Sequence, residues 1–233
     1  MPRWKRTIDI IFSLAALPVL AVATLVMTVI VAIVSPGSVL FRQVRVGYRG
    51  RQFRIYKFRT MMQGADTVAH QAYLTQLIAS GATMTKLDAR RDTRLIPGAW
   101  FLRATGIDEP PQLLNVLRGE MSLIGPRPCI PYEYEQYTPA QQMRFEAVPG
   151  LTGLWQISGK NRTTFEEMIR LDVEYARNLS LRRDLSILAR TIPALVQQVG
   201  DTRRSRRRTR REKERMAVPS CIEPKNVLER NPS

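Results

Sequence analysis

The chain has 233 residues, of which 36 are Lys or Arg and 20 are Asp or Glu, giving a formal net charge of +16. This length suits one globular domain with appendages, and 44% hydrophobic residues are enough for a buried core. Two cysteines without CxxC spacing and one histidine, His70, exclude a disulfide framework, a cysteine zinc site and a histidine-rich metal site. The basic balance favours anionic partners: phospholipid headgroups, nucleic acid or phosphorylated substrates.

Residues 8–34 form an almost wholly apolar run, interrupted by Asp9, Ser13, Pro18 and two threonines. A straight helix of this length would reach roughly 40 Å, more than the hydrocarbon core of a bilayer. Three interpretations compete: a cleaved signal peptide, a helix that crosses the membrane, and a re-entrant helix that bends and returns. The run is too long for a signal core, and no clear small-x-small cleavage site precedes Pro36.

The charges on both sides of this run help to decide between crossing and re-entry. Three basic residues precede it in residues 3–6, and seven follow it in residues 39–60, where no acidic residue occurs. Because basic flanks prefer the cytoplasmic side, both ends are predicted to stay there. Pro18 removes a helical hydrogen bond and favours a bend, with a proline-kinked crossing helix as the alternative. We therefore predict a re-entrant membrane helix in residues 1–36, bent near Pro18.

Residues 37–200 are predicted to form a small, mostly helical domain of mixed α/β class. Two strands are expected on either side of residues 47–50, and residues 150–159 read as loop or strand. Hydrophobic periodicity and helix-start signals predict helices at 67–80, 98–104, 110–118, 138–148, 165–178 and 181–199. The pattern of residues 181–199 suits a helix on a membrane surface and a core-packing helix equally well.

The C-terminal residues, 201–233, form a basic tail. Residues 203–215 carry nine basic and two acidic side chains, a net charge of +7, and the tail has no hydrophobic periodicity. We predict that it is disordered. It also supports an alternative function, that of a membrane-tethered protein binding anionic lipid or nucleic acid without catalysis. Nucleic acid is the weaker partner, because the tail lacks folded readout elements and interleaved aromatic residues.

An acidic pair, Asp108 and Glu109, precedes Pro110 and Pro111. Proline is favoured in the first turn of a helix, so the pair falls at a helix start, and an acid that only caps the helix is one interpretation. In the other, the positive end of the helix keeps the carboxylate ionised, so that it can attack a phosphorus atom. Its neighbour can then hold Mg²⁺ together with phosphate oxygens and waters.

Basic side chains near this pair are candidate phosphate ligands. Arg103 lies five residues before Asp108, and Arg127 is fixed between two prolines. Guanidinium groups bind phosphate through two parallel hydrogen bonds, although a solvated or carboxylate-paired arginine is the alternative for each. Lys57 and Arg59 can add positive charge for a phosphate or contact lipid headgroups.

Four motifs occur in order along residues 5–199: Phe-Arg-Thr-Met at 58–61, Asp-Glu-Pro-Pro-Gln-Leu at 108–113, Met-Ser-Leu-Ile-Gly-Pro-Arg-Pro at 121–128, and Pro-Gly-Leu-Thr-Gly at 149–153. With them the chain strongly resembles the bacterial sugar transferase family. These are monotopic polyprenyl-phosphate sugar-1-phosphate transferases, which begin exopolysaccharide and glycan assembly. The resemblance implies a re-entrant membrane helix and a small catalytic domain on the cytoplasmic face of the bacterial inner membrane.

The resemblance also implies a reaction and its residues. A nucleotide sugar, usually a UDP-sugar, gives its sugar-1-phosphate to polyprenyl (undecaprenyl) phosphate, with release of UMP. A ping-pong route would pass through a phosphosugar on Asp108, with Glu109 as its acidic partner and both residues near Mg²⁺. By the same resemblance Arg103, Gln112 and Arg127 line the phosphate site. The implied partners are the nucleotide sugar, the polyprenyl phosphate and membrane lipids, with downstream glycosyltransferases as further candidates.

The sequence departs from the family pattern at three places. Pro110 stands where the family usually has leucine, which removes one backbone donor at the helix start. That N–H has no partner within a helix, so activity is compatible with the change, as is lowered activity. Leu17 precedes Pro18 where small members have serine, and the arginine-rich tail is not part of the pattern.

Overall fold

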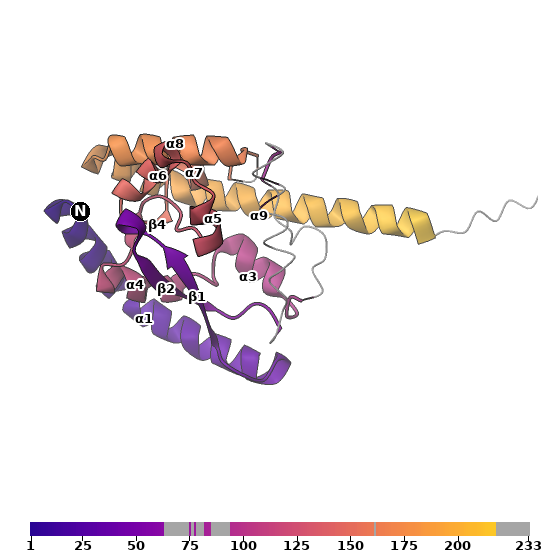
Figure 1. The fold of residues 1–233 in the computed structure, drawn as a ribbon. Helices are drawn as coiled ribbons and strands as arrows, with labels where there is room; N and C mark the ends of the chain where they lie inside the picture. Colours follow the sequence, from indigo (N-terminus) through magenta and orange to yellow (C-terminus); the bar gives the residue numbers. More distant parts are fainter. Residues whose placement is uncertain (63–74, 76, 78–81, 85–93, 161, 218–233) are drawn as a thin grey trace, which may run out of the picture.

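The computed structural model describes residues 1–62, 75, 77, 82–84, 94–160 and 162–217, with side chains described as far as residue 205. Within these residues helices dominate and the strands form two separate two-stranded sheets, which confirms the predicted mixed, mostly helical fold. Figure 1 shows α1 (Arg3–Val34) along one side, α8 (Phe165–Arg177) along the opposite side, and the end of α9 (Leu181–Ala217) projecting beyond the body. The predicted helix at 67–80, with His70, lies almost wholly outside the described residues.

The apolar N-terminal run forms α1, which contains Pro18 and is helical throughout. Figure 1 shows that α1 changes direction part-way along its length. Because proline has no N–H, the carbonyl four residues before Pro18 loses its helical partner, which permits a bend. By length and composition α1 could cross a membrane, and only 17% of its most apolar window is buried. Re-entry to the same face stays a prediction.

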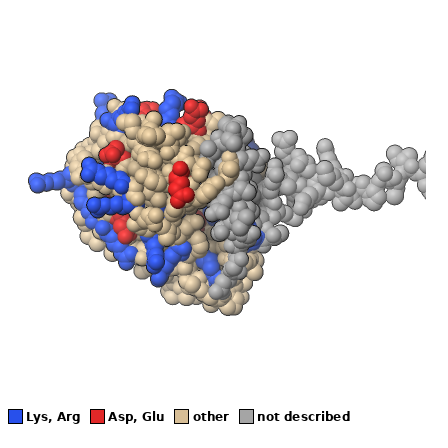
Figure 2. Space-filling view, in the orientation of Figure 1, with Lys and Arg blue, Asp and Glu red and all other residues tan. Residues whose placement is uncertain are grey.

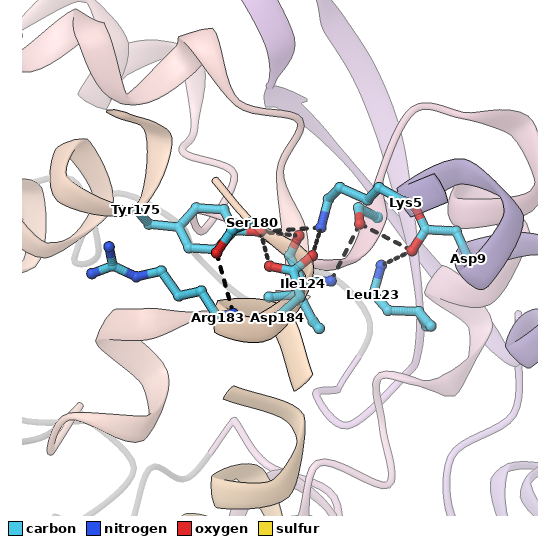
Figure 3. Close-up of polar contacts among 9 residues, drawn as sticks. Lys5, Asp9, Leu123, Ile124, Tyr175, Ser180, Arg183 and Asp184 are labelled. Carbon is cyan, nitrogen blue, oxygen red and sulfur yellow. Dashed lines mark hydrogen bonds and ion pairs between the residues drawn. The ribbon is translucent and has the colours of Figure 1, made fainter. Parts of the chain in front are cut away.

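The buried face of α1 begins polar and becomes apolar. Its buried residues recur every four or seven positions, as one helical face does: Lys5, Asp9, Ser13, Leu20, Met27 and Val31. Lys5 Nζ contacts the Asp184 carboxylate at 2.5 Å and donates to the Tyr175 hydroxyl at 3.0 Å (Figure 3). Asp9 accepts from the Ser122 hydroxyl and the Leu123 amide. The start of α1 is therefore docked onto the body by polar contacts.

Two of the three basic residues in the N-terminal flank serve this docking. Lys5 is 2% exposed, and the Arg6 guanidinium donates to the carbonyls of Val116 and Leu117. The charged ends of both side chains therefore bind groups of the protein. The basic flank from which the topology was predicted thus serves partly to stabilise the fold. Figure 2 nevertheless shows Lys and Arg side chains gathered toward the side where α1 begins.

Replacing Lys5 with methionine is expected to destabilise the fold by about 3–5 kcal/mol, because it leaves Asp184 buried without its counter-charge. Thermal unfolding in detergent should show a melting temperature lower by on the order of 10 °C. Arg3→Met, at an exposed position of the same helix, is the control and should leave the melting temperature unchanged. Equal melting temperatures for the two variants would contradict the stabilising role of the pair.

The predicted strand pair is an antiparallel hairpin of β1 (Leu40–Val46) and β2 (Gln52–Phe58). The connecting turn is η1 (Tyr48–Gly50), where Arg49 adopts a left-handed conformation with φ 51°. Phe58, at the end of β2, packs with Leu113 against the apolar half of α1. The hairpin thus lies between α1 and the segment that carries the acidic pair.

The acidic pair lies between two short helical segments, as predicted. Gly106, with φ 74°, ends α3 (Ala99–Thr105), and η3 (Pro110–Gln112) leads directly into α4 (Leu113–Arg118). Gly119, with φ 79°, stops α4. The two prolines therefore begin the helix in a 3₁₀ turn, and the pair lies just outside it.

The second sheet pairs β3 (Ser122–Ile124) with β4 (Gly150–Thr152) in parallel. The two backbones approach each other closely at glycines. A Cβ added to Gly125 would lie 2.2 Å from the Val148 carbonyl oxygen, and one added to Gly150 would lie 2.0 Å from the Gly125 nitrogen. Only residues without a side chain permit this approach, and it places the 126–128 turn beside β4.

The remaining elements form the main core. They are α5 (Pro131–Glu135), α6 (Pro139–Gln142), η4 (Met143–Glu146), α7 (Leu154–Ile157) and α8. Trp155, Phe145 and Met168 are among the buried side chains that join α7, η4 and α8. Thr138 and Thr164 begin α6 and α8 with capping boxes. The prediction that residues 150–159 are loop or strand is wrong for α7, which is helical.

Helix α9 continues to Ala217, so the prediction of disorder from residue 201 is wrong for residues 201–217; residues 218–233 lie outside the described part. Arginine is a good helix former, and no proline follows Pro193 before residue 219, so the helix begun at Leu181 can propagate. The helix is both core-packed and exposed: Ile187 is buried, whereas Ile192 and Val196 are exposed.

Candidate active site

A pocket of about 430 Å³, open to solvent, lies beside the acidic pair. The hairpin, η3, the 126–128 turn, β4 and α7 all contribute to it. Its lining residues are Arg45, Ile55, Lys57, Glu109, Gln112, Arg127, Pro128, Gly150, Leu151, Trp155, Gln156 and Lys160. Four cationic side chains face one carboxylate among these described residues, so the pocket carries a net charge of +3. It suits a ligand with several negative charges.

Backbone hydrogen bonds fix the position of Asp108 and Glu109. The Phe58 amide donates to the Asp108 carbonyl at 2.8 Å, which ties the pair to the end of β2. The Glu109 amide donates to the Gly106 carbonyl at 3.0 Å and closes the turn after α3. Asp108 is 7% exposed, whereas Glu109 lines the pocket. The pair is therefore presented by a rigid turn at the edge of the pocket.

Glu109 is paired with Lys57, whose ammonium lies 2.7 Å from its carboxylate. Burial alone would raise the pKa of Glu109, but the attraction of Lys57, Lys160 and Arg127 outweighs it and lowers the pKa to about 2. The Glu109 side chain is still 35% exposed, which fits a carboxylate that stays ionised. Glu109 makes no side-chain bond to cap η3, so its role is not that of a helix cap.

The pKa of Asp108 is shifted in the opposite direction. Burial raises its pKa above the ordinary aspartate value, Glu109 adds to the rise, and the nearby charges of Lys57 and Arg103 oppose it. Poor solvation makes a carboxylate more nucleophilic than it is in water, while the nearby charges of Lys57 and Arg103 favour its ionised form. Two adjacent carboxyl groups with pKa values displaced in opposite directions are typical of sites in which the two groups have separate tasks.

Arg127 enters the pocket from the rigid turn between two prolines. Its guanidinium lies 5.9 Å from the centre of the Trp155 ring, within cation–π range. Arg45 lies nearby, and burial together with repulsion from Arg127 lowers the pKa of Arg45 to about 10, so it remains charged at neutral pH. The clustered cations repel one another, and a bound anion would relieve that repulsion.

The structure brings most of the predicted site residues together. Lys57, Glu109, Gln112 and Arg127 line the pocket, while Asp108 adjoins it and interacts electrostatically with Arg103. Arg59 is not brought to the pocket: it is buried and donates to the carbonyl of Ser35 at the end of α1. That contact ties the end of α1 to the hairpin.

Among the charged and aromatic residues that line the pocket, Arg45, Trp155 and Lys160 were missed from the sequence. Arg45 was counted only as a basic residue flanking the membrane segment. Its position before buried Val46 at the end of a strand was the available signal, because a strand end beside a turn can aim a charge at a site. No signal in the sequence places Lys160 there.

Asp108 and Glu109 suit Mg²⁺ as part of a shell that a substrate phosphate and waters complete. Within the described part of the chain no cluster of three or more His, Cys, Asp or Glu side chains could hold a metal. Mg²⁺ commonly takes only one or two protein carboxylates and completes its shell with phosphate oxygens and waters. Asp108 and Glu109 fit that pattern, although a metal at Glu109 has to compete with Lys57.

Most of the chain is similar to known proteins. Residues 2–198 match the family model described as bacterial sugar transferase. The exopolysaccharide production protein ExoY of Sinorhizobium fredii is 38% identical over 191 residues, covering 82% of this chain and 84% of that protein. The UDP-glucose:undecaprenyl-phosphate glucose-1-phosphate transferase of Caulobacter vibrioides is 37% identical, covering 82% of this chain and 69% of that protein.

A third relative is longer. The undecaprenyl-phosphate galactose phosphotransferase of Salmonella typhimurium is 34% identical over 196 residues, covering 84% of this chain but 41% of that protein. The family match spans α1, the acidic pair, the pocket and α9 as far as residue 198, and leaves out the arginine-rich end of α9. This chain therefore belongs to the bacterial sugar transferase family.

Proposed function

We propose that the protein is a phosphoglycosyl transferase. It moves a sugar-1-phosphate from a UDP-sugar to undecaprenyl phosphate, releases UMP, and thereby initiates exopolysaccharide or glycan synthesis. The observation that carries this proposal is the buried carboxylate of Asp108 at the edge of a pocket with four cationic side chains. The names of relatives that act on undecaprenyl phosphate support the same acceptor.

The proposed chemistry has two displacements at one phosphorus atom. A carboxylate oxygen of Asp108 attacks the phosphorus that bears the sugar, and the bond to the bridging oxygen breaks, so that UMP leaves with that oxygen. A phosphate oxygen of the polyprenyl phosphate then attacks the same phosphorus. The bond to Asp108 breaks, its carboxylate is restored, and the polyprenyl diphosphate sugar is the product.

The pocket residues would stabilise charge during both displacements. In this proposal Arg127, Arg45 and Lys160 hold the diphosphate oxygens, and Lys57 keeps Glu109 ionised and oriented. Gln112 offers an amide for hydrogen bonding to the same group. When bound by Asp108 and Glu109, Mg²⁺ would neutralise phosphate charge and polarise the phosphorus–oxygen bonds.

The proposed location follows from α1 and the acceptor. A polyprenyl phosphate keeps its chain in the bilayer and its phosphate at the surface. We propose that α1 is re-entrant and holds the pocket at the cytoplasmic face of the inner membrane. The exposed apolar side chains along α1 would contact lipid: Ile11, Phe12, Leu14, Val19, Val22, Leu25, Val26, Val29 and Ile33.

The acid limb of the pH–rate profile is expected to report Asp108, because only the ionised carboxylate is a nucleophile. Its pKa is raised, so activity should rise with pH through a value above that of an ordinary aspartate. Lys57→Met removes the strongest charge that lowers this pKa and should move the limb to higher pH. Glu109→Gln removes a charge that raises it and should move the limb to lower pH. Profiles of kcat/KM that coincide for all three proteins would contradict the assignment.

The experiment that tests the function is UMP release from a panel of UDP-sugars by detergent-purified full-length protein, with and without undecaprenyl phosphate and Mg²⁺. Multiple turnover that requires both lipid and metal is expected with at least one sugar. A folded protein that releases no UMP from the panel, even after Pro110→Leu restores the usual family residue, would overturn the proposal.

A further inference from the structure

Four consecutive backbone carbonyls, those of residues 126–129, are each held by a different donor. The Gly150 amide donates to Pro126 at 2.9 Å and the Val46 amide to Cys129 at 2.8 Å. Between them, Arg144 Nη2 donates to the Arg127 carbonyl at 2.9 Å, and Arg45 Nη1 donates to the Pro128 carbonyl at 3.4 Å. Two buried guanidinium groups thus hold the two carbonyls at the centre of the turn that carries Arg127.

The turn needs donors of this kind because of its sequence. Prolines at 126 and 128 have no N–H, so the segment has fewer amides for regular pairing, and the Arg127 amide is turned toward the Asp172 carboxylate. Its carbonyls are then the main groups through which the rest of the protein can hold it. Arginine reaches them from a distance, with a planar group that can bond in more than one direction.

Arg144, from η4, is itself held on several sides. It is fully buried, forms an ion pair with Asp172 of α8, and donates through Nη1 to the Tyr137 hydroxyl at 2.6 Å. Tyr137 in turn donates to Glu133. Both members of the Arg144–Asp172 pair have completely buried side chains.

This pair is poorly explained by stability alone. Burying two charges costs about as much as their attraction returns, and well-packed apolar residues often serve as well or better. What apolar residues cannot supply is a donor to the Arg127 carbonyl. On the other side of the same residue, the Arg127 guanidinium lies in the pocket above Trp155.

We propose that Arg144, oriented by Asp172, is a positioning residue that fixes the backbone at Arg127 and so directs the Arg127 guanidinium onto the diphosphate of the donor. Arg144 itself does not line the pocket and acts through Arg127. The inference rests on the proposed function, since it assigns a diphosphate to this pocket. It adds η4 and α8, which lie behind the pocket wall, to the residues that determine donor affinity.

A double-mutant cycle tests the proposal, with full-length protein in detergent and UDP as the titrated probe. Arg144→Lys keeps the charge opposite Asp172 but loses the planar second donor, and Arg127→Met removes the guanidinium in the pocket. In the protein that retains Arg127, we expect Arg144→Lys to weaken UDP binding about tenfold, equivalent to about 1.4 kcal/mol. In the Arg127→Met background the same change should alter binding less than about twofold, because the group it positions is gone.

Two further variants separate positioning from loss of stability. Lys5→Arg is the matched control: it is also a charge-retaining change in a buried ion pair, but the Lys5–Asp184 pair does not touch residues 126–129. It should leave UDP affinity unchanged in both backgrounds. Asp172→Asn, a near-isosteric change, should repeat the effect of Arg144→Lys, with the KM for the UDP-sugar raised more than kcat is lowered.

The outcomes are distinguishable. Equal loss of UDP affinity in both backgrounds would show that Arg144 acts on the fold in general, and would overturn the positioning role while leaving the proposed function intact. Unchanged affinity in a folded Arg144→Lys protein would do the same. If the wild-type protein neither binds UDP nor releases UMP, the proposed function is overturned, and the role of Arg144 with it.

Discussion

Asp108→Asn is expected to abolish turnover, with kcat lowered by about 10⁴-fold or more, while the protein stays folded. The asparagine amide has nearly the same shape as the carboxylate but lacks the anionic oxygen that forms the bond to phosphorus. Stability should not suffer. Burial raises the pKa of Asp108, so the charged form is disfavoured in the folded protein, and a neutral side chain removes that penalty.

The measurement is UMP release with and without undecaprenyl phosphate, beside thermal unfolding of the same preparation. A single-turnover burst of UMP without acceptor is expected in the wild type and should be absent in Asp108→Asn. Glu146→Gln is the control, since Glu146 is 64% exposed and only loosely paired with Arg49 at 3.9 Å. Measurable turnover by purified Asp108→Asn would remove Asp108 as the nucleophile and leave Glu109 as the candidate.

Local signals in the sequence predicted the local structure well. Glycines at 47 and 50 between alternating strands indicated the hairpin, and the prolines before Gln112 indicated where the helix after the acidic pair begins. In both cases the conformation depends on residues a few positions apart. Arg103, Asp108 and Glu109 are likewise close in sequence, so the sequence alone was enough to group them.

The errors arose where composition was read without its structural context. The basic tail was predicted to be disordered because it lacks apolar periodicity, yet residues 201–217 extend a helix that packing at Ile187 already holds. Propagating a helix costs far less than starting one, and arginine propagates it well. Likewise, Lys5 and Arg6 were counted only as flanking charges that indicate membrane topology, whereas both also bind groups of the protein more than 100 residues away.

The pocket could not be predicted as a whole, because it depends on contacts between segments that are far apart in sequence. Lys57, Glu109, Arg127 and Lys160 come from four separate segments, and their convergence depends on strand pairings such as that of β3 with β4. Parallel pairing of residues as far apart in sequence as Ser122 and Gly150 leaves no short-range pattern. What the sequence does contain is the glycines that make the pairing possible, although their spacing alone does not reveal which backbone they approach.

Gly150→Ala is therefore expected to disrupt the site through the fold. The added Cβ would lie 2.0 Å from the Gly125 nitrogen, 2.5 Å from the Ile124 carbonyl carbon and 2.6 Å from the Thr152 oxygen. These are backbone atoms, which cannot rotate away as the end of a flexible side chain can. The strands must separate, and the loss of stability should be at the upper end for single substitutions, about 4 kcal/mol or more.

Because β4 holds the carbonyl of Pro126, separation should also release the turn that carries Arg127. Thermal unfolding and UDP binding should therefore be lost together in Gly150→Ala. Gly200→Ala is the matched control: Gly200 is helical, its added Cβ would meet nothing within 4 Å, and alanine there should stabilise by about 0.5–1 kcal/mol. A Gly150→Ala protein that unfolds at the wild-type temperature and binds UDP normally would contradict the close backbone approach on which the pocket depends.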